Sequence, residues 1–294
     1  MRAISNDIKG TLLAIISGAT FGLIPLFVIP VMADGMGYAS TIFYRFLFGG
    51  IGMLGMLLYR QTSLRIGWGD FWRISLLSLI YVVCAITLFK SYDYITSGVA
   101  TALIYTNPIW CALIRAICFR ERTSWSLAVS LLLAVVGVAM LSGALTDMGK
   151  VSWIGLLLGM TSGIGYGIYL VALPRLKIKK MPSLKLNFYI FIMAAVYILP
   201  WCMAMDGGVE KIHCTDCLWG LLLVGFIPTA FSNICVTMAL RLIDTTVVAI
   251  LGAFEPFTAM LIGITLLGEA FDVFTITGGV LVLVAVTIIT LKKR

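Results

Sequence analysis

The sequence predicts an all-α integral membrane protein: ten transmembrane helices, arranged as two inverted five-helix repeats around a central cavity. Three observations predict this class: the composition, the number of long apolar stretches, and a pattern that occurs twice. Hydrophobic residues make up 61% of the chain and charged residues 12%, against roughly 45–50% and 25% in soluble domains. Such a composition excludes an ordinary soluble domain.

Ten apolar stretches are long enough to cross a bilayer, which needs about 20 residues per helix. They lie near 10–33, 37–59, 72–92, 96–119, 124–145, 152–173, 184–205, 217–240, 245–268 and 271–291. The first stretch lacks the short apolar core and cleavage site of a signal peptide. We therefore expect it to remain in the mature protein.

A proline followed by a glutamate appears at equivalent places in two stretches, 148 residues apart. Pro108 precedes Glu121, and Pro256 precedes Glu269. Such self-similarity indicates a duplicated unit. The two expected units are residues 1–148 and 149–294. Because each unit has five spans, an odd number, the second enters the membrane from the opposite side, as in the inverted repeats of secondary transporters.

The net charge of +8 is distributed asymmetrically between the expected loops. With the N-terminus inside, sixteen basic residues fall on the inner side: Arg2, Lys9, Arg60, Arg65, Arg73, Arg120, Arg122, Arg175, Lys177, Lys179, Lys180, Lys185, Arg241, Lys292, Lys293 and Arg294. Only Lys90, Lys150 and Lys211 fall outside. This bias predicts cytoplasmic termini in a plasma or inner membrane. The basic excess thus indicates topology, with the lipid bilayer as partner and no nucleic acid.

Three segments resemble the drug/metabolite transporter superfamily, specifically its ten-helix EamA branch. They are Arg45 in the second span, the run from Ser97 to Pro108 with Glu121, and the run from Phe254 to Glu269. The resemblance covers essentially the whole chain. It implies a cavity lined by the first four helices of each repeat, and a small-molecule substrate. The branch includes exporters of amino acids and other metabolites as well as uptake systems.

Glu255 is the only acidic residue deep inside an expected span, and Arg45 lies at mid-depth in another. A charge there is costly unless it is paired or faces water. Glu255 has three open roles: contact with a cationic substrate group, a coupling proton site, or a fixed structural partner of Arg45. Arg45 either holds a substrate carboxylate or is architectural. Arg115, near the inner end of its span, either snorkels to the headgroups or forms an inner gate.

The two prolines predict kinks at mid-membrane, because each removes a helical hydrogen bond. Polar and aromatic residues gather at the same depth, where they suit a small organic ligand. With the prolines, the remaining cavity candidates are Tyr81, Tyr105, Asn107, Pro108, Trp110, Tyr166, Tyr169, Asn233 and Pro256. Small residues four apart, including Gly18 and Gly163, indicate close helix packing.

Enzymatic and cofactor-dependent functions are not indicated by the sequence. His213, Cys214 and Cys217 share an outer loop, but zinc needs four suitable ligands. We expect no metal and no cofactor, and we leave open a disulfide between the two cysteines. There is no phosphate-binding glycine loop and no catalytic Ser/His/Asp set. Energy for transport must therefore come from gradients or exchange.

The sequence-based hypothesis is a secondary transporter that works by alternating access and exports a small organic metabolite such as an amino acid. Uptake of a small organic cation or amine, and multidrug efflux, are the alternatives within transport. A non-transporting membrane receptor or scaffold is the alternative of another class. A homodimer is left open.

Overall fold

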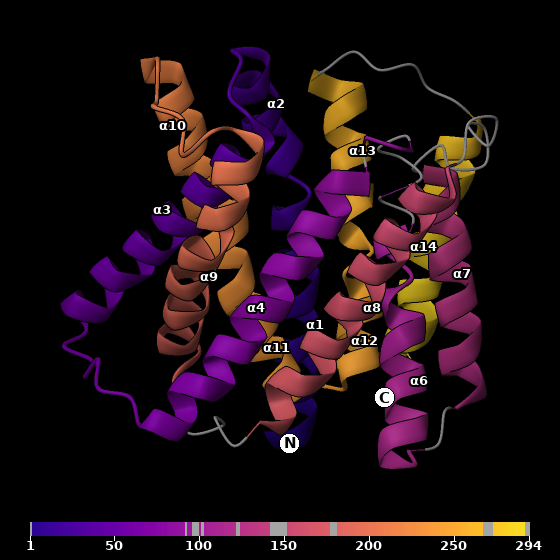
Figure 1. Ribbon diagram of the computed structural model, residues 1–294. Helices are drawn as coiled ribbons and strands as arrows, with labels where there is room; N and C mark the ends of the chain where they lie inside the picture. The colour runs from indigo at the N-terminus through magenta and orange to yellow at the C-terminus, as the bar shows by residue number, and fades with distance from the viewer. Residues whose placement is uncertain are drawn as a thin grey trace.

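The computed structural model describes residues 2–91, 93–95, 100, 103–121, 124–141, 152–176, 181–266 and 273–291. Over these residues the chain consists of helices, turns and bends, with no strand among them. The helices stand side by side as a bundle (Figure 1). The fold class is therefore all-helical, as expected.

The helices follow the chain in two groups of similar layout. The first group is α1 (Arg2–Phe21), α2 (Ile24–Ala33), α3 (Tyr38–Tyr59), α4 (Trp68–Ser91), α6 (Asn107–Phe119) and α7 (Trp125–Leu141). The second is α8 (Trp153–Arg175), α9 (Ser183–Met205), α10 (Thr215–Val224), the π-helix η2 (Gly225–Phe231), α11 (Ser232–Leu242), α12 (Thr245–Leu251), α13 (Phe254–Leu266) and α14 (Val273–Leu291).

Six described segments are long and apolar enough to cross a membrane. They are Asn6–Ala33, Tyr38–Tyr59, Trp68–Ser91, Trp153–Arg175, Ser183–Met205 and Thr215–Leu242. Four shorter apolar helices, Asn107–Phe119, Trp125–Met140, Thr245–Thr258 and Ile276–Ala285, lie where the fourth, fifth, ninth and tenth spans were predicted. The order of ten apolar segments therefore agrees with the sequence.

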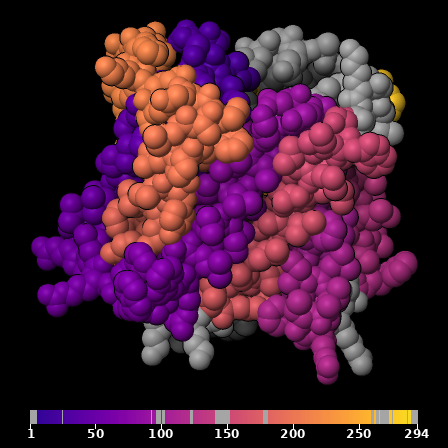
Figure 2. Space-filling view, viewed as in Figure 1, coloured from indigo at the N-terminus to yellow at the C-terminus, as the bar shows by residue number. Residues whose placement is uncertain are grey.

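The two faces of the bundle are distinguished by the helix ends that they carry. The face where the chain begins, here called the N-terminal face, carries the start of α1 and the lower end of α6 (Figure 1). The opposite face carries α2 and α10, which pack on each other. On the side seen in Figure 2, α4 and α8 run next to each other across the middle of the molecule.

Pro108 and Pro256 do not kink continuous helices, which corrects the expectation from sequence. Each lies in the first turn of a new helix that follows a break. A turn at Tyr105 and Thr106 precedes α6, and a turn at Gly252 and Ala253 precedes α13. Proline suits a first turn, because the backbone N–H groups there have no partner within the helix. The fourth and ninth spans are thus discontinuous.

Each broken segment packs against a glycine-bearing helix of the other half. A Cβ placed on Gly18 of α1 would lie 3.1 Å from the carbonyl oxygen of Leu251. A Cβ on Gly163 of α8 would lie 2.6 Å from the carbonyl oxygen of Leu103. Since Leu103 and Leu251 are 148 residues apart, the two contacts are equivalent. The packing role predicted for these glycines agrees with the contacts.

Two buried serines add equivalent hydrogen bonds beside the same glycines. Ser17 Oγ donates to the carbonyl oxygen of Ser232 at 3.0 Å, and Ser162 Oγ donates to the carbonyl oxygen of Cys84 at 2.9 Å. Ser17 and Ser162 precede Gly18 and Gly163, and Cys84 and Ser232 are again 148 residues apart. The contacts between the halves therefore obey the repeat. At one edge of the bundle, α7 packs on α14.

We expect Gly163→Ala to lower the thermal unfolding midpoint of the purified protein in detergent micelles. The added methyl group would overlap a backbone carbonyl that cannot move aside independently, a cost of about 1–3 kcal/mol. Gly55→Ala in α3 is the matched control, because nothing lies within 4 Å of the position that its methyl group would take. Equal stability of the two variants would contradict the close-packing role.

Candidate functional site

A cavity of about 280 Å³ lies between the two halves. Its wall consists of Phe21, Gly22, Ile24, Ile42, Arg45, Phe46, Tyr81, Cys84, Ala85, Leu88, Phe89, Ile104, Tyr105, Asn107, Tyr166, Glu255 and Pro256. The volume is close to the lower end of small-molecule sites, which span about 300–1,000 Å³. Because the lining comes from the end of α1, the start of α3 and the end of α4, the cavity lies toward the face opposite the N-terminal face.

The structure brings seven of the eleven predicted cavity residues to this wall. They are Arg45, Tyr81, Tyr105, Asn107, Tyr166, Glu255 and Pro256. The seven come from α3, α4, α6 with its preceding turn, α8 and α13. Side chains far apart in the sequence therefore meet at one site.

Arg45 is held in place through one nitrogen and borders the cavity. Its Nε donates to Thr229 Oγ1 at 2.7 Å, and Thr229 Oγ1 in turn donates to the carbonyl oxygen of Val224 at 2.7 Å. The guanidinium carbon lies 6.0 Å from the centre of the Phe21 ring. No carboxylate among the described residues lies within the 4.0 Å of an ion pair with it. The guanidinium can therefore bind an anion from the cavity.

Glu255 lies in the first turn of α13, directly after the break in the ninth span. The positive end of a helix dipole favours a carboxylate at this position. Tyr105, from the break in the fourth span, lies within hydrogen-bonding reach of the Glu255 carboxylate. The two breaks thus meet at the cavity. Arg45 and Glu255 share this wall without forming a direct ion pair, so the predicted alternative of a fixed pair is not what the structure shows.

Four predicted residues do not line the cavity. Trp110 packs its Cβ against Gly167 and donates to Thr106 Oγ1 at 3.0 Å, and Pro108 is buried in the first turn of α6. Tyr169 is fully buried behind the wall, with its ring centre 5.2 Å from that of Tyr81 and 6.0 Å from that of Tyr166. Asn233 is also fully buried.

Two of the buried polar side chains keep an acceptor without a partner. Asn233 donates to the carbonyl oxygen of Thr229 at 2.8 Å, and Asn107 donates to that of Ile104 at 2.9 Å. The Oδ1 atoms of both amides have no hydrogen-bond partner among the described residues. Buried acceptors of this kind usually bind water or a ligand. Both therefore fit a site that exchanges polar contents.

Sequence reasoning missed Phe21 and Thr229. Phe21 ends α1 at a break before α2, and Thr229 lies in the π-helix η2 next to Pro228. π-bulges often occur at functional sites. The available signal for Thr229 was a proline and a hydroxyl within an apolar stretch.

A network of ion pairs closes the N-terminal face. Arg115 in α6 pairs with both Glu121 and Asp244, and its Nη1 donates to Thr246 Oγ1 at 2.9 Å. Arg175 at the end of α8 pairs with Glu121 on its other carboxylate oxygen. Arg115 thus does not extend to the headgroups, which corrects the snorkelling alternative. Arg115, Glu121, Arg175 and Asp244 are called the inner network below.

The inner network shifts the titration of its exposed member. The hydrogen bond from Arg115 holds the pKa of the Glu121 carboxyl below its ordinary value, and Arg175 acts in the same direction, while partial burial opposes both. A carboxylate with a lowered pKa stabilises the fold while it is ionised. The network is therefore intact at neutral pH.

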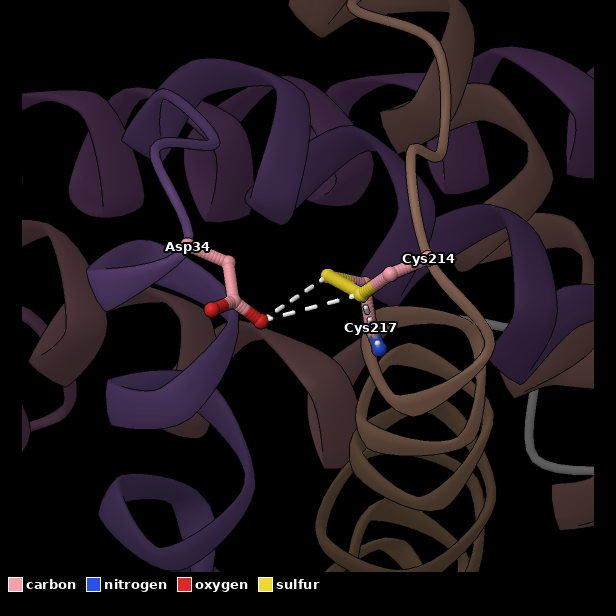
Figure 3. Close-up of side chains that lie close together, drawn as sticks. All are labelled: Asp34, Cys214 and Cys217. Carbon is pink, nitrogen blue, oxygen red and sulfur yellow. Dashed lines mark hydrogen bonds between the residues drawn. A yellow bond between two sulfur atoms is a disulfide. The ribbon is translucent and has the colours of Figure 1, made fainter.

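Cys214 and Cys217 are joined by a disulfide, which resolves the alternative left open by the sequence (Figure 3). Asp34 reaches them from the end of α2, with Oδ2 3.3 Å from Cys217 Sγ and 3.6 Å from Cys214 Sγ. The Cys217 N–H donates to Cys214 Sγ at 3.0 Å, which caps α10. In this oxidised form the sulfurs are not thiolates and do not offer the ligands that zinc prefers.

Comparisons with known proteins agree on the class. The model of the EamA-like transporter family matches residues 8–143 and 153–291. An uncharacterized transporter of Archaeoglobus fulgidus is 24% identical over 277 residues, which cover 93% of each chain. The biotin transporter of Escherichia coli (strain K12) is 32% identical over 139 residues, 46% of this chain and 44% of that one. A crystal structure with 16% sequence identity superposes with a TM-score of 0.82 over 96% of each chain.

We expect Glu121→Gln to destabilise the protein at neutral pH by about 0.5–1 kcal/mol, the range of partly exposed ion pairs. Glu121 has a lowered pKa in the folded state, so its contribution is present above the unfolded pKa of about 4.3. It is lost as the pH falls through the lower folded-state pKa. Unfolding midpoints of wild type and variant should therefore converge below about pH 4.

Asp70→Asn is the matched control for this measurement. Asp70 forms an exposed pair with Arg73 three residues away on α4, which should contribute little. A difference between wild type and Glu121→Gln that stays the same from neutral pH down to about pH 3.5 would contradict the assigned role of the ionised carboxylate.

Proposed function

Because the chain belongs to the EamA-like transporter family, within the drug/metabolite transporter superfamily, we propose that it is a secondary transporter that exports an amino acid or a related zwitterionic metabolite. The family is one of transporters and not of enzymes, and the chain is a multi-pass membrane protein. One observation carries the proposal. Arg45 and Glu255 border the same cavity with no direct ion pair between them.

The two charges suit the two ends of a zwitterion. A guanidinium binds a carboxylate through two parallel hydrogen bonds, and Arg45 has no other carboxylate within ion-pair distance among the described residues. A substrate ammonium would lie at Glu255, with the rings of Tyr81 and Tyr166 in the same wall. Aromatic faces attract a cation by about 0.5–2 kcal/mol. The apolar remainder of the wall would accept the side chain.

Uptake of a carboxylate without an ammonium group is the second candidate. Relatives named biotin transporters match a 139-residue segment of this chain, and Arg45 alone would bind such a carboxylate. In that case Glu255 would serve coupling and not substrate binding. Uptake of an organic cation or amine, or efflux of cationic drugs, would use Glu255 and leave Arg45 without a substrate role.

Alternating access is supported by the contacts between the halves. The equivalent contacts of Gly18 with Leu251 and of Gly163 with Leu103 suit two inverted repeats that can exchange conformations. The cavity lies toward one face, and the inner network, including Arg115, joins α6, α8 and the start of α12 at the other. We therefore assign Arg115 to an inner gate, with the N-terminal face in the cytoplasm as the basic residues indicate.

Transport would be driven by a gradient or by exchange, with Glu255 as the proton site. A carboxylate at mid-membrane that faces a cavity is the usual form of such a site. Protonation would release the substrate ammonium, because the attraction between the two charges disappears. The Tyr105 hydroxyl, within reach of Glu255, would hold the carboxyl group in position in both states.

We expect Arg45→Gln and Glu255→Gln each to weaken amino-acid binding and flux at least about tenfold in proteoliposomes, since each removes one charge-assisted contact. Flux of a panel of radiolabelled amino acids, biotin and an organic amine is the measurement. Arg73→Gln, which alters an exposed pair at the start of α4, is the control and should leave flux unchanged.

The pattern of losses separates the candidates. Loss in both variants with amino acids supports the zwitterion, whereas biotin flux sensitive only to Arg45→Gln supports carboxylate uptake. Saturable flux of none of the panel, with folded protein, would overturn the transport proposal for these classes. Glu255→Gln should also abolish the dependence of flux on an imposed pH gradient.

A further inference from the structure

A second hollow lies at the N-terminal face and is separate from the central cavity. Its volume is about 350 Å³, and its wall consists of Lys9, Arg60, Pro182, Ser183, Leu184, Ile234, Met238, Arg241 and Leu242. None of these residues borders the central cavity. The wall comes from α1, the end of α3, the start of α9 and α11. It is called the basic groove below.

Three cations from three elements converge on the basic groove. Lys9 comes from α1, Arg60 follows the last residue of α3, and Arg241 lies at the end of α11. The wall contains no acidic residue, and none of the three cations pairs with a carboxylate among the described residues. Their positive charge is therefore not neutralised by the protein there.

The start of α9 adds to the positive potential of the basic groove. Ser183 is the first residue of this 23-residue helix, and the first N–H to bond within the turn is that of Leu186, to the carbonyl oxygen of Pro182. The earlier N–H groups form the positive end of the helix dipole, which favours anions. Arg241 Nη2 donates to the carbonyl oxygen of Met181 at 2.6 Å. Its guanidinium is thus held beside this helix start.

The rest of the wall is apolar. Leu184, Ile234, Met238 and Leu242 line it together with the cations. Ile234, Met238 and Leu242 follow one face of α11, at intervals of four residues. A free inorganic anion would use the cations but not this stripe. A ligand with an anionic head and an apolar tail would use both.

We propose that the basic groove binds the phosphate group of an anionic phospholipid from the leaflet at the N-terminal face. Arg60, Lys9 and Arg241 contact the phosphate, and an acyl chain lies along Ile234 and Met238. Basic pockets between membrane helices are suited to such headgroups. Since α1 and α3 belong to the first half and α9 and α11 to the second, the lipid bridges the two halves. This site does not depend on the identity of the transported substrate.

The test uses the full chain in detergent micelles and short-chain lipids as probes. Dioctanoyl phosphatidylglycerol should raise the thermal unfolding midpoint in a saturable manner, because a ligand that binds only the folded state stabilises it. Dioctanoyl phosphatidylcholine, with the same chains and no net charge, should not. The half-saturating concentration of phosphatidylglycerol should rise with salt, as for any exposed charge contact.

The triple variant Lys9→Gln, Arg60→Gln, Arg241→Gln should raise that concentration about tenfold, because it removes all three phosphate contacts. A matched variant, Arg65→Gln, Arg73→Gln, Arg120→Gln, removes three charges outside the wall and should change it less than about twofold. If the first triple variant does not fold, Lys9→Gln with Arg60→Gln decides, since these two substitutions leave the contact of Arg241 with Met181 intact.

Three results would overturn the proposal. Equal stabilisation by phosphatidylcholine would mean that the headgroup charge is not recognised. Equal losses in the two triple variants would mean that general surface charge attracts the lipid. Competition by glycerol phosphate at the same concentration as the lipid would assign the basic groove to a soluble phosphate compound instead.

Discussion

The structure depends on the close approach of each half's first helix to the broken helix of the other half. Gly18 lies against the carbonyl oxygen of Leu251, and Gly163 against that of Leu103. Only a residue without a side chain allows a helix to come this near to backbone that has left regular helical geometry. Equivalent contacts at the two places mean that the halves hold each other's breaks.

The breaks in turn create the chemistry of the central cavity. Irregular backbone at membrane depth is tolerated only where protein or a water-filled space satisfies its polar groups. Here one break brings Tyr105 and the other brings Glu255 to the same wall, where Arg45 faces them from α3. The symmetry of the repeat places the breaks, and the unequal residues in them make one polar site. The basic groove lies outside this symmetry, on the ends of α1, α3, α9 and α11.

The helical class and the order of ten apolar segments could be predicted from sequence, because long apolar stretches have few alternatives in a bilayer. The packing role of Gly18 and Gly163 followed from their spacing. The breaks at Pro108 and Pro256 did not, because proline suits both a kinked interior and a first turn. Which aromatic residue lines the cavity was equally open. Tyr166 borders it and Tyr169, three residues later, is buried behind it.

Contacts between distant residues could not be obtained from local patterns. Arg115 is six residues from Glu121 but 129 from Asp244, so the sequence suggested the gate without its partners. Thr229, which holds Arg45, belongs to a π-helix whose altered register no apolar pattern indicates. The unequal residues of the repeat were visible early, since Arg45 corresponds to Ile190 in the second half.

The central claim is that the cavity changes its access from one face to the other as the inner network opens. Cys84 borders the cavity, and the buried Cys111 lies one turn before Arg115. The direct test is maleimide labelling of each cysteine, quantified by peptide mass spectrometry, in wild type and in the variant Glu121→Gln, Asp244→Asn. The account predicts that Cys111 labels faster and Cys84 more slowly in the variant. Faster labelling of both, or no change in either, would contradict it.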